Sequence, residues 1–96
     1  MLRHIVLFKF KEENKAENVA ATKAMLDALP GKIAEIWSSE TYVDIGEKQD
    51  NYDLMLVSDF ENSEALARYI VHPDHKAVGE FMKPLRESRV CVDIEL

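Results

Sequence analysis

The sequence predicts an α+β domain of the ferredoxin-like class, with the element order βαββαβ and a four-stranded antiparallel sheet. Four segments alternate with the period of two that is typical of strands, and two longer segments have the spacing of amphipathic helices. Only three glycines and three prolines separate them. Because 96 residues is the length of one domain, we expect a single domain over residues 1–96.

The first strand is predicted over Leu2–Phe10. Its two alternating faces both carry bulky apolar or aromatic side chains, as in a strand that is covered on both sides. A helix is expected from Glu12 to about Leu29, because acidic residues favour a helix N-terminus and apolar residues follow at helical spacing. Pro30 and Gly31 then end this helix.

Two further strands are predicted over Ile33–Val43 and Tyr52–Phe60, on either side of a charged loop at residues 44–51. The pattern of the first of these strands is the weaker one. In the second, neither face is polar throughout, which again indicates a strand that is covered on both sides.

The second helix is predicted to begin at a cap, Asn62 or Ser63, and to run to about Val71. Three of its residues are expected to be buried, namely Leu66, Tyr69 and Ile70. Because Pro73 disfavours helical geometry at the residue before it, the helix should break at His72.

A shorter helix is predicted after this break, from about Asp74 to Met82. It presents Val78, Phe81 and Met82, and Pro84 ends it. The last strand is expected over Ser88–Leu96. Its apolar residues face one way, and the residues of the other face are Arg89, Cys91, Asp93 and Glu95.

The predicted sheet has more apolar surface than one protomer can cover. Two helices cover only one face of a four-stranded sheet, which leaves the other face as a large exposed apolar patch. A second copy packed sheet to sheet across a two-fold axis is the simplest cover. We therefore predict a homodimer through the open sheet face.

Charge and composition argue against several classes of function. Lys and Arg number 12 against 18 Asp and Glu, a formal charge of −6, so the chain lacks the basic stripe of nucleic-acid binding and is unsuited to an anionic membrane surface. No apolar run approaches the ~20 residues of a membrane span, and residues 1–10 read as a strand rather than a signal peptide. Cys91 is the only cysteine, so we expect no intrachain disulfide and a reducing, cytoplasmic location.

Candidate chemistry is concentrated around the predicted helix break. His75 falls in the first turn of the segment that begins at Pro73. A helix N-terminus disfavours an extra positive charge, so a partly buried imidazole at this position stays neutral. A neutral imidazole can accept a proton. The phenol of Tyr69 can donate a hydrogen bond to a carbonyl or an enolate. His4, on the first strand, can point into the same cavity. Together the three residues fit proton abstraction next to a carbonyl, with no cofactor.

Each of these residues also has a structural interpretation. His72 or Asp74 can cap the short helix, and His75 can be a surface residue with a backbone hydrogen bond. Tyr69 and His4 can belong to the core. Residues of this kind, taken one at a time, are more often structural than functional.

Metal binding and thiol chemistry are two further alternatives. His72, Asp74 and His75 form a candidate metal site, but Pro73 makes it difficult for both imidazoles to converge, and a catalytic zinc needs three protein ligands. Cys91 lies on a strand with no base in sequence reach. We predict no metal, no cofactor and no cysteine nucleophile.

Several stretches of the chain resemble the stress-responsive A/B barrel domain family, also called Dabb. They are His4–Lys11, Tyr52–Phe60, and the pattern Tyr69-x-x-His72-Pro73-x-His75 with the later Lys83–Arg86. The resemblance spans nearly the whole chain. It implies a dimeric α/β barrel, in which two ferredoxin-like sheets meet.

The resemblance implies less about function. The family name reports stress-induced expression in plants, and most bacterial members look like domains without an assigned reaction. One plant member closes a polyketide ring by intramolecular aldol condensation. Its base is similar to His75, and it has a tyrosine similar to Tyr69 and a histidine similar to His4. It carries a further histidine in its pocket, at the position where this chain has Leu54. An apolar side chain thus replaces a polar one at this position.

Two functions therefore remain in view. We favour a homodimer with a small cavity and no turnover, which binds a small apolar carbonyl ligand, is purely structural or has a stress-related role, because one site histidine is missing. The alternative is a cofactor-independent cyclase or lyase that acts on a polyketide-like or dicarbonyl substrate. In that enzyme His75 is the base and Tyr69 is the hydrogen-bond donor. Neither function involves nucleic acid or a membrane.

Overall fold

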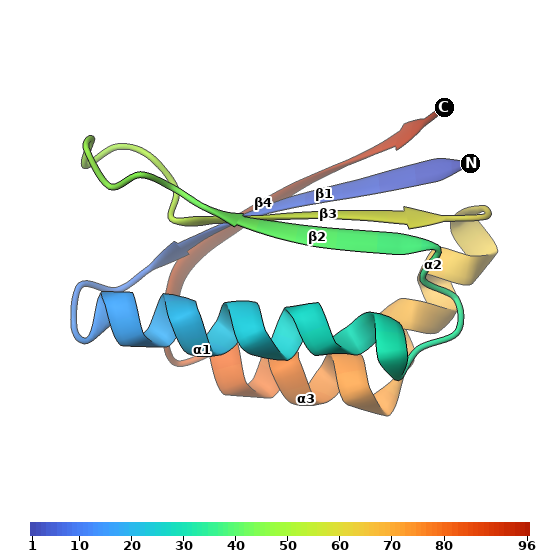
Figure 1. The fold of residues 1–96 in the computed structure, drawn as a ribbon, viewed down its shortest axis with the longest axis horizontal. Coiled ribbons are helices and arrows are strands. Elements are labelled where there is room, and N and C mark those ends of the chain that lie inside the picture. The colour runs from blue at the N-terminus through green and yellow to red at the C-terminus, as the bar shows by residue number, and fades with distance from the viewer.

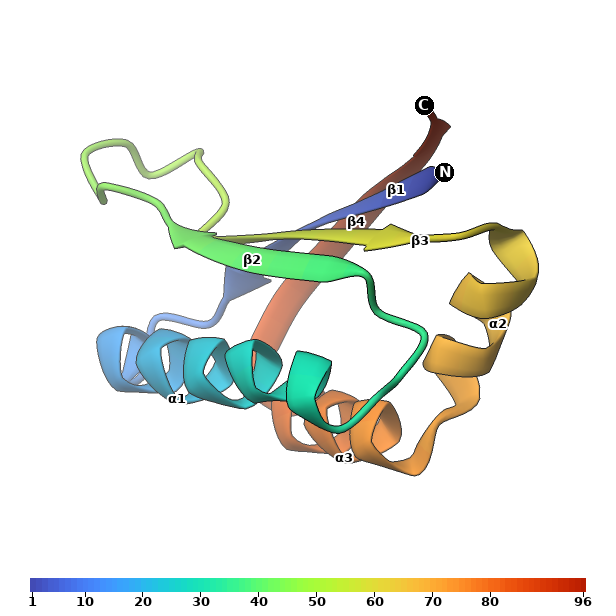
Figure 2. The same ribbon diagram turned by 45° about the vertical axis from the view of Figure 1, so that its right-hand side comes forward.

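The computed structural model describes all 96 residues and has helices on one face of the sheet only. The strands are β1 (Leu2–Phe10), β2 (Ser38–Val43), β3 (Leu54–Phe60) and β4 (Arg86–Glu95). They lie in the order β2-β3-β1-β4, and each neighbouring pair is antiparallel. The helices are α1 (Lys15–Ala28), α2 (Ser63–Val71) and α3 (Pro73–Met82), all below the sheet in Figures 1 and 2. The predicted ferredoxin-like fold is confirmed.

The core lies between the helices and the sheet. Every second residue of β1 is buried, from Leu2 to Phe10, and the aromatic rings of Phe10 and Phe60 are completely enclosed. Burying a side chain of this size contributes about 1.5–3 kcal/mol relative to leaving it exposed. None of the three helices is long and apolar enough to cross a membrane.

The first helix begins later than predicted. Residues 12–14 form a turn instead, and Asn14 in this turn has left-handed backbone geometry with φ of 53°. The side chain of Glu12 accepts a hydrogen bond from the Lys15 ammonium at 2.8 Å, and no side chain caps the helix. At its other end α1 stops at Ala28 and is followed by the 3₁₀ turn η1 (Leu29–Gly31). The helix therefore ends where Pro30 and Gly31 predicted, to within one helical turn.

The prediction of a strand from residue 33 is wrong, because β2 begins only at Ser38. The Ile33 amide donates to the Leu29 carbonyl at 2.9 Å, and the Ile36 amide donates to Ile33 at 3.3 Å. These backbone groups are thus used in local turns and not in the sheet. Both isoleucine side chains are nevertheless buried. The apolar residues that predicted a strand here are core residues at one end of the domain.

The broken second helix is as predicted. Asn62 caps α2 by accepting a hydrogen bond from the Ala65 amide at 3.0 Å, and His72 leaves helical geometry with ψ of 136°. Two expected burial sites are wrong, since Ile70 is 45% exposed and Phe81 is 38% exposed. Each short helix therefore has apolar residues outside its buried face.

The sheet face away from the helices is apolar and uncovered. Its side chains on β4 are Val90, Val92 and Ile94, which are 46%, 58% and 37% exposed. In the register of the sheet Val92 pairs with Ile5, and Val90 pairs with Leu7. Figure 2 shows that no helix lies on this side of the sheet. The predicted division of the β4 residues between two faces agrees with this register.

Candidate functional site

Three aromatic residues predicted from the sequence come together between α2, α3 and β1. The ring centroids of Tyr69 and His75 are 4.4 Å apart, and those of Tyr69 and His4 are 6.3 Å apart. The ring of Phe60 supports Tyr69 from β3 at 4.9 Å. We refer to His4, Tyr69 and His75 as the helix-break cluster, because the break at His72 brings the last turn of α2 against the first turn of α3.

The imidazole of His75 is held by the backbone of α2. Its Nδ1 lies 3.0 Å from the carbonyl oxygen of Ile70, which can only accept, so Nδ1 carries the hydrogen. The other nitrogen, Nε2, then has a free lone pair and makes no hydrogen bond within the protein. Burial is the main cause that lowers the pKa of His75, and it outweighs the backbone hydrogen bond, which raises that pKa. The ring is therefore a neutral proton acceptor at pH 7.

Tyr69 has a buried ring and an unpaired hydroxyl. The residue is 1% exposed, and its hydroxyl makes no hydrogen bond within the protein. Burial raises the pKa of Tyr69 to about 12, against a smaller lowering effect from the charge of Arg89. The phenol thus keeps its proton and remains a donor at neutral pH. No completely enclosed side-chain oxygen or nitrogen lacks a partner, so this hydroxyl lies at the boundary of the core and is not completely enclosed.

His4 is oriented by a carboxylate on the neighbouring strand. Its Nδ1 lies 2.5 Å from Oδ1 of Asp93, the residue directly opposite it in the β1–β4 register. His4 is buried, whereas Asp93 is half-exposed. Asp93 was not singled out from the sequence. The signal was present, because β1 and β4 are neighbours in the predicted fold, and alternation puts Asp93 on the face opposite to Val92.

The other candidate residues either have a structural role or lie outside the helix-break cluster. His72 caps α3, because its Nδ1 accepts a hydrogen bond from the Asp74 amide at 3.1 Å. No group of three His, Cys, Asp or Glu side chains is placed to hold a metal ion. Cys91 is exposed on β4, and Leu54 is a core residue of β3.

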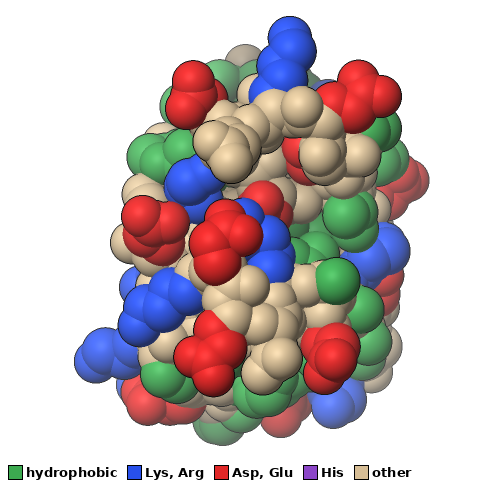
Figure 3. Space-filling view, turned by 90° about the vertical axis from the view of Figure 1, so that its left-hand side faces the viewer, with side chains coloured by type: hydrophobic (Ala, Val, Ile, Leu, Met, Phe, Trp, Pro, Cys, Tyr) green, Lys and Arg blue, Asp and Glu red, His purple; other side chains and the backbone are tan.

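The largest cavity lies elsewhere, between α1 and the segment that joins β2 to β3. Its volume is about 670 Å³, its floor contains Ala16 and Ala20, and no residue of the helix-break cluster lines it. Both of its lysines are engaged. The ammonium of Lys15 contacts Glu12 and Asp53, and that of Lys23 contacts Asp27 and Thr41. This end of the molecule has a mixed surface of acidic and basic side chains (Figure 3).

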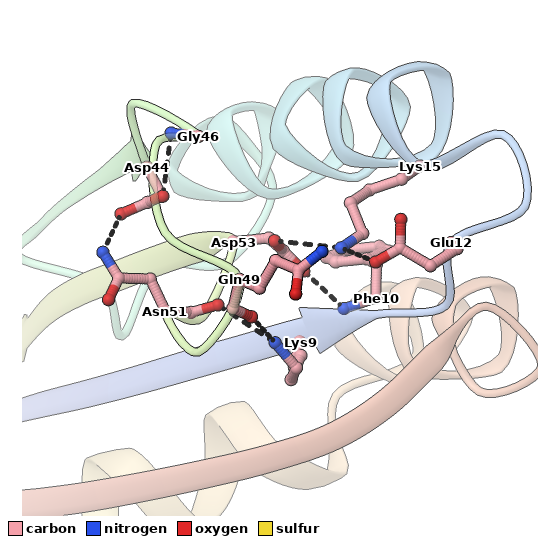
Figure 4. A network of polar contacts seen from close by, with 9 residues as sticks. All are labelled: Lys9, Phe10, Glu12, Lys15, Asp44, Gly46, Gln49, Asn51 and Asp53. Carbon is pink, nitrogen blue, oxygen red and sulfur yellow. Dashed lines mark hydrogen bonds and ion pairs between the residues drawn. The ribbon is translucent and has the colours of Figure 1, made fainter.

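A network of polar contacts attaches the loop at residues 44–53 to β1 and α1 (Figure 4). Asp53 accepts a hydrogen bond from the Phe10 amide at 2.7 Å and faces Lys15 at 3.5 Å. The ammonium of Lys9 donates to the carbonyl oxygens of Gln49 and Asn51. We refer to this set of contacts as the loop network. Its contacts hold the loop against β1 and α1.

Comparison with known proteins agrees with this architecture. The model of the Stress Responsive A/B Barrel Domain family matches residues 2–96. The chain belongs to this family. The family resemblance inferred from the sequence is thereby confirmed, together with the ferredoxin-like fold of the protomer.

Three similar proteins extend this result. An uncharacterised protein of Streptomyces coelicolor is 33% identical over 79 residues, which is 80% of this chain and 81% of that protein. Olivetolic acid cyclase of Cannabis sativa is 24% identical over 96 residues, covering 96% of this chain and 93% of the cyclase. The crystal structure of a dimeric ferredoxin-like protein from Bacteroides fragilis has a TM-score of 0.91 at 33% identity, covering 99% of this chain and 95% of that chain.

Proposed function

We propose that the protein is a homodimer whose protomers pack through their open sheet faces. Apolar residues of β4 on this face are exposed in the single protomer, and solvent contact at such a patch is unfavourable. The dimeric state of the similar protein from Bacteroides fragilis supports the same arrangement.

Sedimentation velocity at micromolar concentration tests the dimer. We expect the wild type to sediment as a dimer and Val92→Asp to sediment as a monomer, because a carboxylate in the apolar interface would be desolvated without a partner. Val71→Asp is the matched control, since Val71 is 61% exposed on α2, away from the sheet. A wild type that is folded but monomeric would contradict the proposal.

We propose further that each protomer binds a small, largely apolar carbonyl compound at the helix-break cluster. The observation that carries this proposal is the hydroxyl of Tyr69, a protonated donor at the boundary of the core that has no acceptor within the protein. A carbonyl oxygen supplies the missing acceptor.

Calorimetric titration with acetophenone tests this binding. Because one neutral hydrogen bond contributes about 1 kcal/mol, Tyr69→Phe should weaken the affinity about fivefold. Tyr52→Phe is the matched control, because the hydroxyl of Tyr52 is already paired with Ser88 at 2.8 Å. If Tyr69→Phe binds acetophenone as well as the wild type does, the proposed site is wrong.

A second candidate function is cofactor-free proton abstraction at the same site. It is favoured by the neutral imidazole of His75, whose Nε2 is free to accept a proton. In this reaction Nε2 takes a proton from the carbon next to the carbonyl, and the electron pair of the C–H bond moves into an enolate. The hydroxyl of Tyr69 stabilises the enolate oxygen by donating a hydrogen bond. The similarity to olivetolic acid cyclase is consistent with such a step.

Hydrogen–deuterium exchange at the methyl group of acetophenone tests the second candidate. In D₂O the wild type should accelerate loss of the methyl proton signal, and His75→Gln should remove this acceleration. His72→Asn is the control, because it retains a side chain that can cap α3. Equal exchange rates with and without the wild-type protein would restrict the function to binding.

A further inference from the structure

The large cavity beside α1 has the size and lining of a small-molecule site. Its volume of about 670 Å³ falls within the range of roughly 300–1,000 Å³ that such sites occupy. It lies on the helix side of the sheet, because Val43 on its wall pairs across the sheet with the core residue Leu54. The cavity is therefore on the opposite side of the sheet from the proposed dimer interface.

The floor of the cavity is a stripe of alanines on α1. Ala16, Ala20 and Ala24 are spaced by four residues, so they lie on one face of the helix. Their short side chains leave the space that larger residues would fill, and Val43, which is 51% exposed, adds an apolar wall. This floor suits the apolar body of a ligand, because such a body is transferred from water to an apolar surface favourably.

Both lysines on the cavity wall are already neutralised. The ammonium of Lys23 lies 3.1 Å from Asp27, and it donates to the hydroxyl of Thr41 at 2.8 Å and to the carbonyl oxygen of the same residue at 3.1 Å. All three of its N–H groups are thus used. The ammonium of Lys15 faces Asp53 at 3.5 Å and a second carboxylate at 2.8 Å. An anionic ligand therefore finds no free cation on this wall.

Asp44, by contrast, is a partly buried carboxylate on the same wall that forms no ion pair. Its oxygens accept hydrogen bonds from two neutral donors, the Gly46 amide at 2.9 Å and the side-chain amide of Asn51 at 3.1 Å (Figure 4). A carboxylate has about four lone-pair positions, so these oxygens can accept further hydrogen bonds. The other two carboxylates of the wall, Asp27 and Asp53, are paired with lysines, which leaves Asp44 as the uncompensated charge.

We propose that this cavity binds a small organic amine, with its ammonium group at Asp44 and its apolar body on the alanine floor. An ammonium donates a charge-assisted hydrogen bond to a carboxylate, and such a bond is about twice as strong as a neutral one. The net charge of −6 over the whole chain also favours the approach of a cation. The cavity shares no residue with the helix-break cluster, so this proposal is independent of the carbonyl site.

Titration calorimetry with three phenylalkyl probes tests the proposal. The probes are 4-phenylbutylamine, 4-phenylbutan-1-ol and 4-phenylbutanoate, which have similar apolar bodies and a positive, zero or negative charge. The wild type should bind the amine roughly tenfold more tightly than the alcohol, and the butanoate most weakly. Asp44→Asn should bring the amine and the alcohol within about twofold of each other by weakening only the amine. The asparagine oxygen can still accept a hydrogen bond from the Gly46 amide.

Two further substitutions locate the binding. Asp50→Asn removes the same charge from an exposed position of the same loop and should leave the preference for the amine unchanged. Ala20→Leu reduces the cavity and should weaken the amine and the alcohol by a similar factor. Ala21→Leu is its matched control, because Ala21 is exposed and does not line the cavity.

Equal affinities of the wild type for the amine and the alcohol would overturn the proposal, as would the absence of binding. It would also be wrong if Asp50→Asn weakened the amine as much as Asp44→Asn does, or if Ala20→Leu bound the amine as tightly as the wild type does.

Discussion

The loop network and the helix-break cluster use polar groups in opposite ways. In the loop network the polar groups are paired within the protein. Asp53, for example, accepts a hydrogen bond from the Phe10 amide and faces Lys15. In the helix-break cluster the hydroxyl of Tyr69 and Nε2 of His75 have none. Cavity volume and unpaired polar groups therefore point to different ends of this molecule. The largest cavity adjoins the satisfied network, and the unpaired groups lie at the other end of the helices.

Tyr52 and Tyr69 show this difference between paired and unpaired polar groups. The hydroxyl of Tyr52 is 2.8 Å from the hydroxyl of Ser88, and its ring lies under the ammonium of Lys9. The hydroxyl of Tyr69 has no partner, although its ring is the more deeply buried of the two. A hydrogen bond within the protein stabilises the fold, whereas an unpaired donor at the boundary of the core can donate to a ligand.

The largest expected effect is on the loop network. Asp53→Ala leaves the amide of Phe10, a fully buried residue, without an acceptor. A buried donor without a partner costs about 1–3 kcal/mol, so the free energy of unfolding in urea should fall by that amount. Asp50→Ala, an exposed position in the same loop, is the control and should change little. Equal stability of the two variants would mean that the network is not structural.

A smaller effect separates the two tyrosines. Tyr52→Phe should lower the free energy of unfolding by about 0.5–1.5 kcal/mol, because it removes a hydrogen bond within the protein. Tyr69→Phe should leave the free energy of unfolding nearly unchanged, because no such bond is lost. Urea titrations of both variants make the comparison. A clear loss of stability in Tyr69→Phe would show that its hydroxyl has a structural role.

The smallest effect concerns pH. The pKa of His75 in the folded protein lies below its ordinary value of 6.5, mainly because of burial. As the pH falls from 6.5 toward that lowered pKa, the unfolded chain binds a proton first, so the wild type loses stability. His75→Gln lacks this contribution and should lose less stability over the same window, as measured by urea titrations at several pH values. Parallel losses in the two proteins would contradict a lowered pKa.

Much of the fold was predictable because its signals are local. Alternation identified β1 and the two faces of β4, and Pro73 fixed the break at His72. The errors arose where burial depends on tertiary packing. Ile33 and Ile36 are apolar because they close the end of the core, not because they belong to a strand. Ile70 is apolar and yet lies on the exposed side of α2.

The candidate site was predictable in part for the same reason. Tyr69 and His75 are close in the chain, so the helix break alone indicated that they meet. The contact of His4 with Asp93 spans 89 positions and depends on the β1–β4 register. The missing partner of the Tyr69 hydroxyl is a property of the whole packed domain. It appears only when every neighbouring acceptor has been placed.

Carbon-13 NMR of acetophenone labelled at its carbonyl carbon, bound to the wild type and to Tyr69→Phe, tests the central claim most directly. A hydrogen bond to the carbonyl oxygen draws electron density from the labelled carbon. We predict a downfield resonance for the ketone bound to the wild type, and its return to the free position in Tyr69→Phe. Identical bound resonances in the two proteins would mean that the hydroxyl of Tyr69 does not receive a ligand carbonyl.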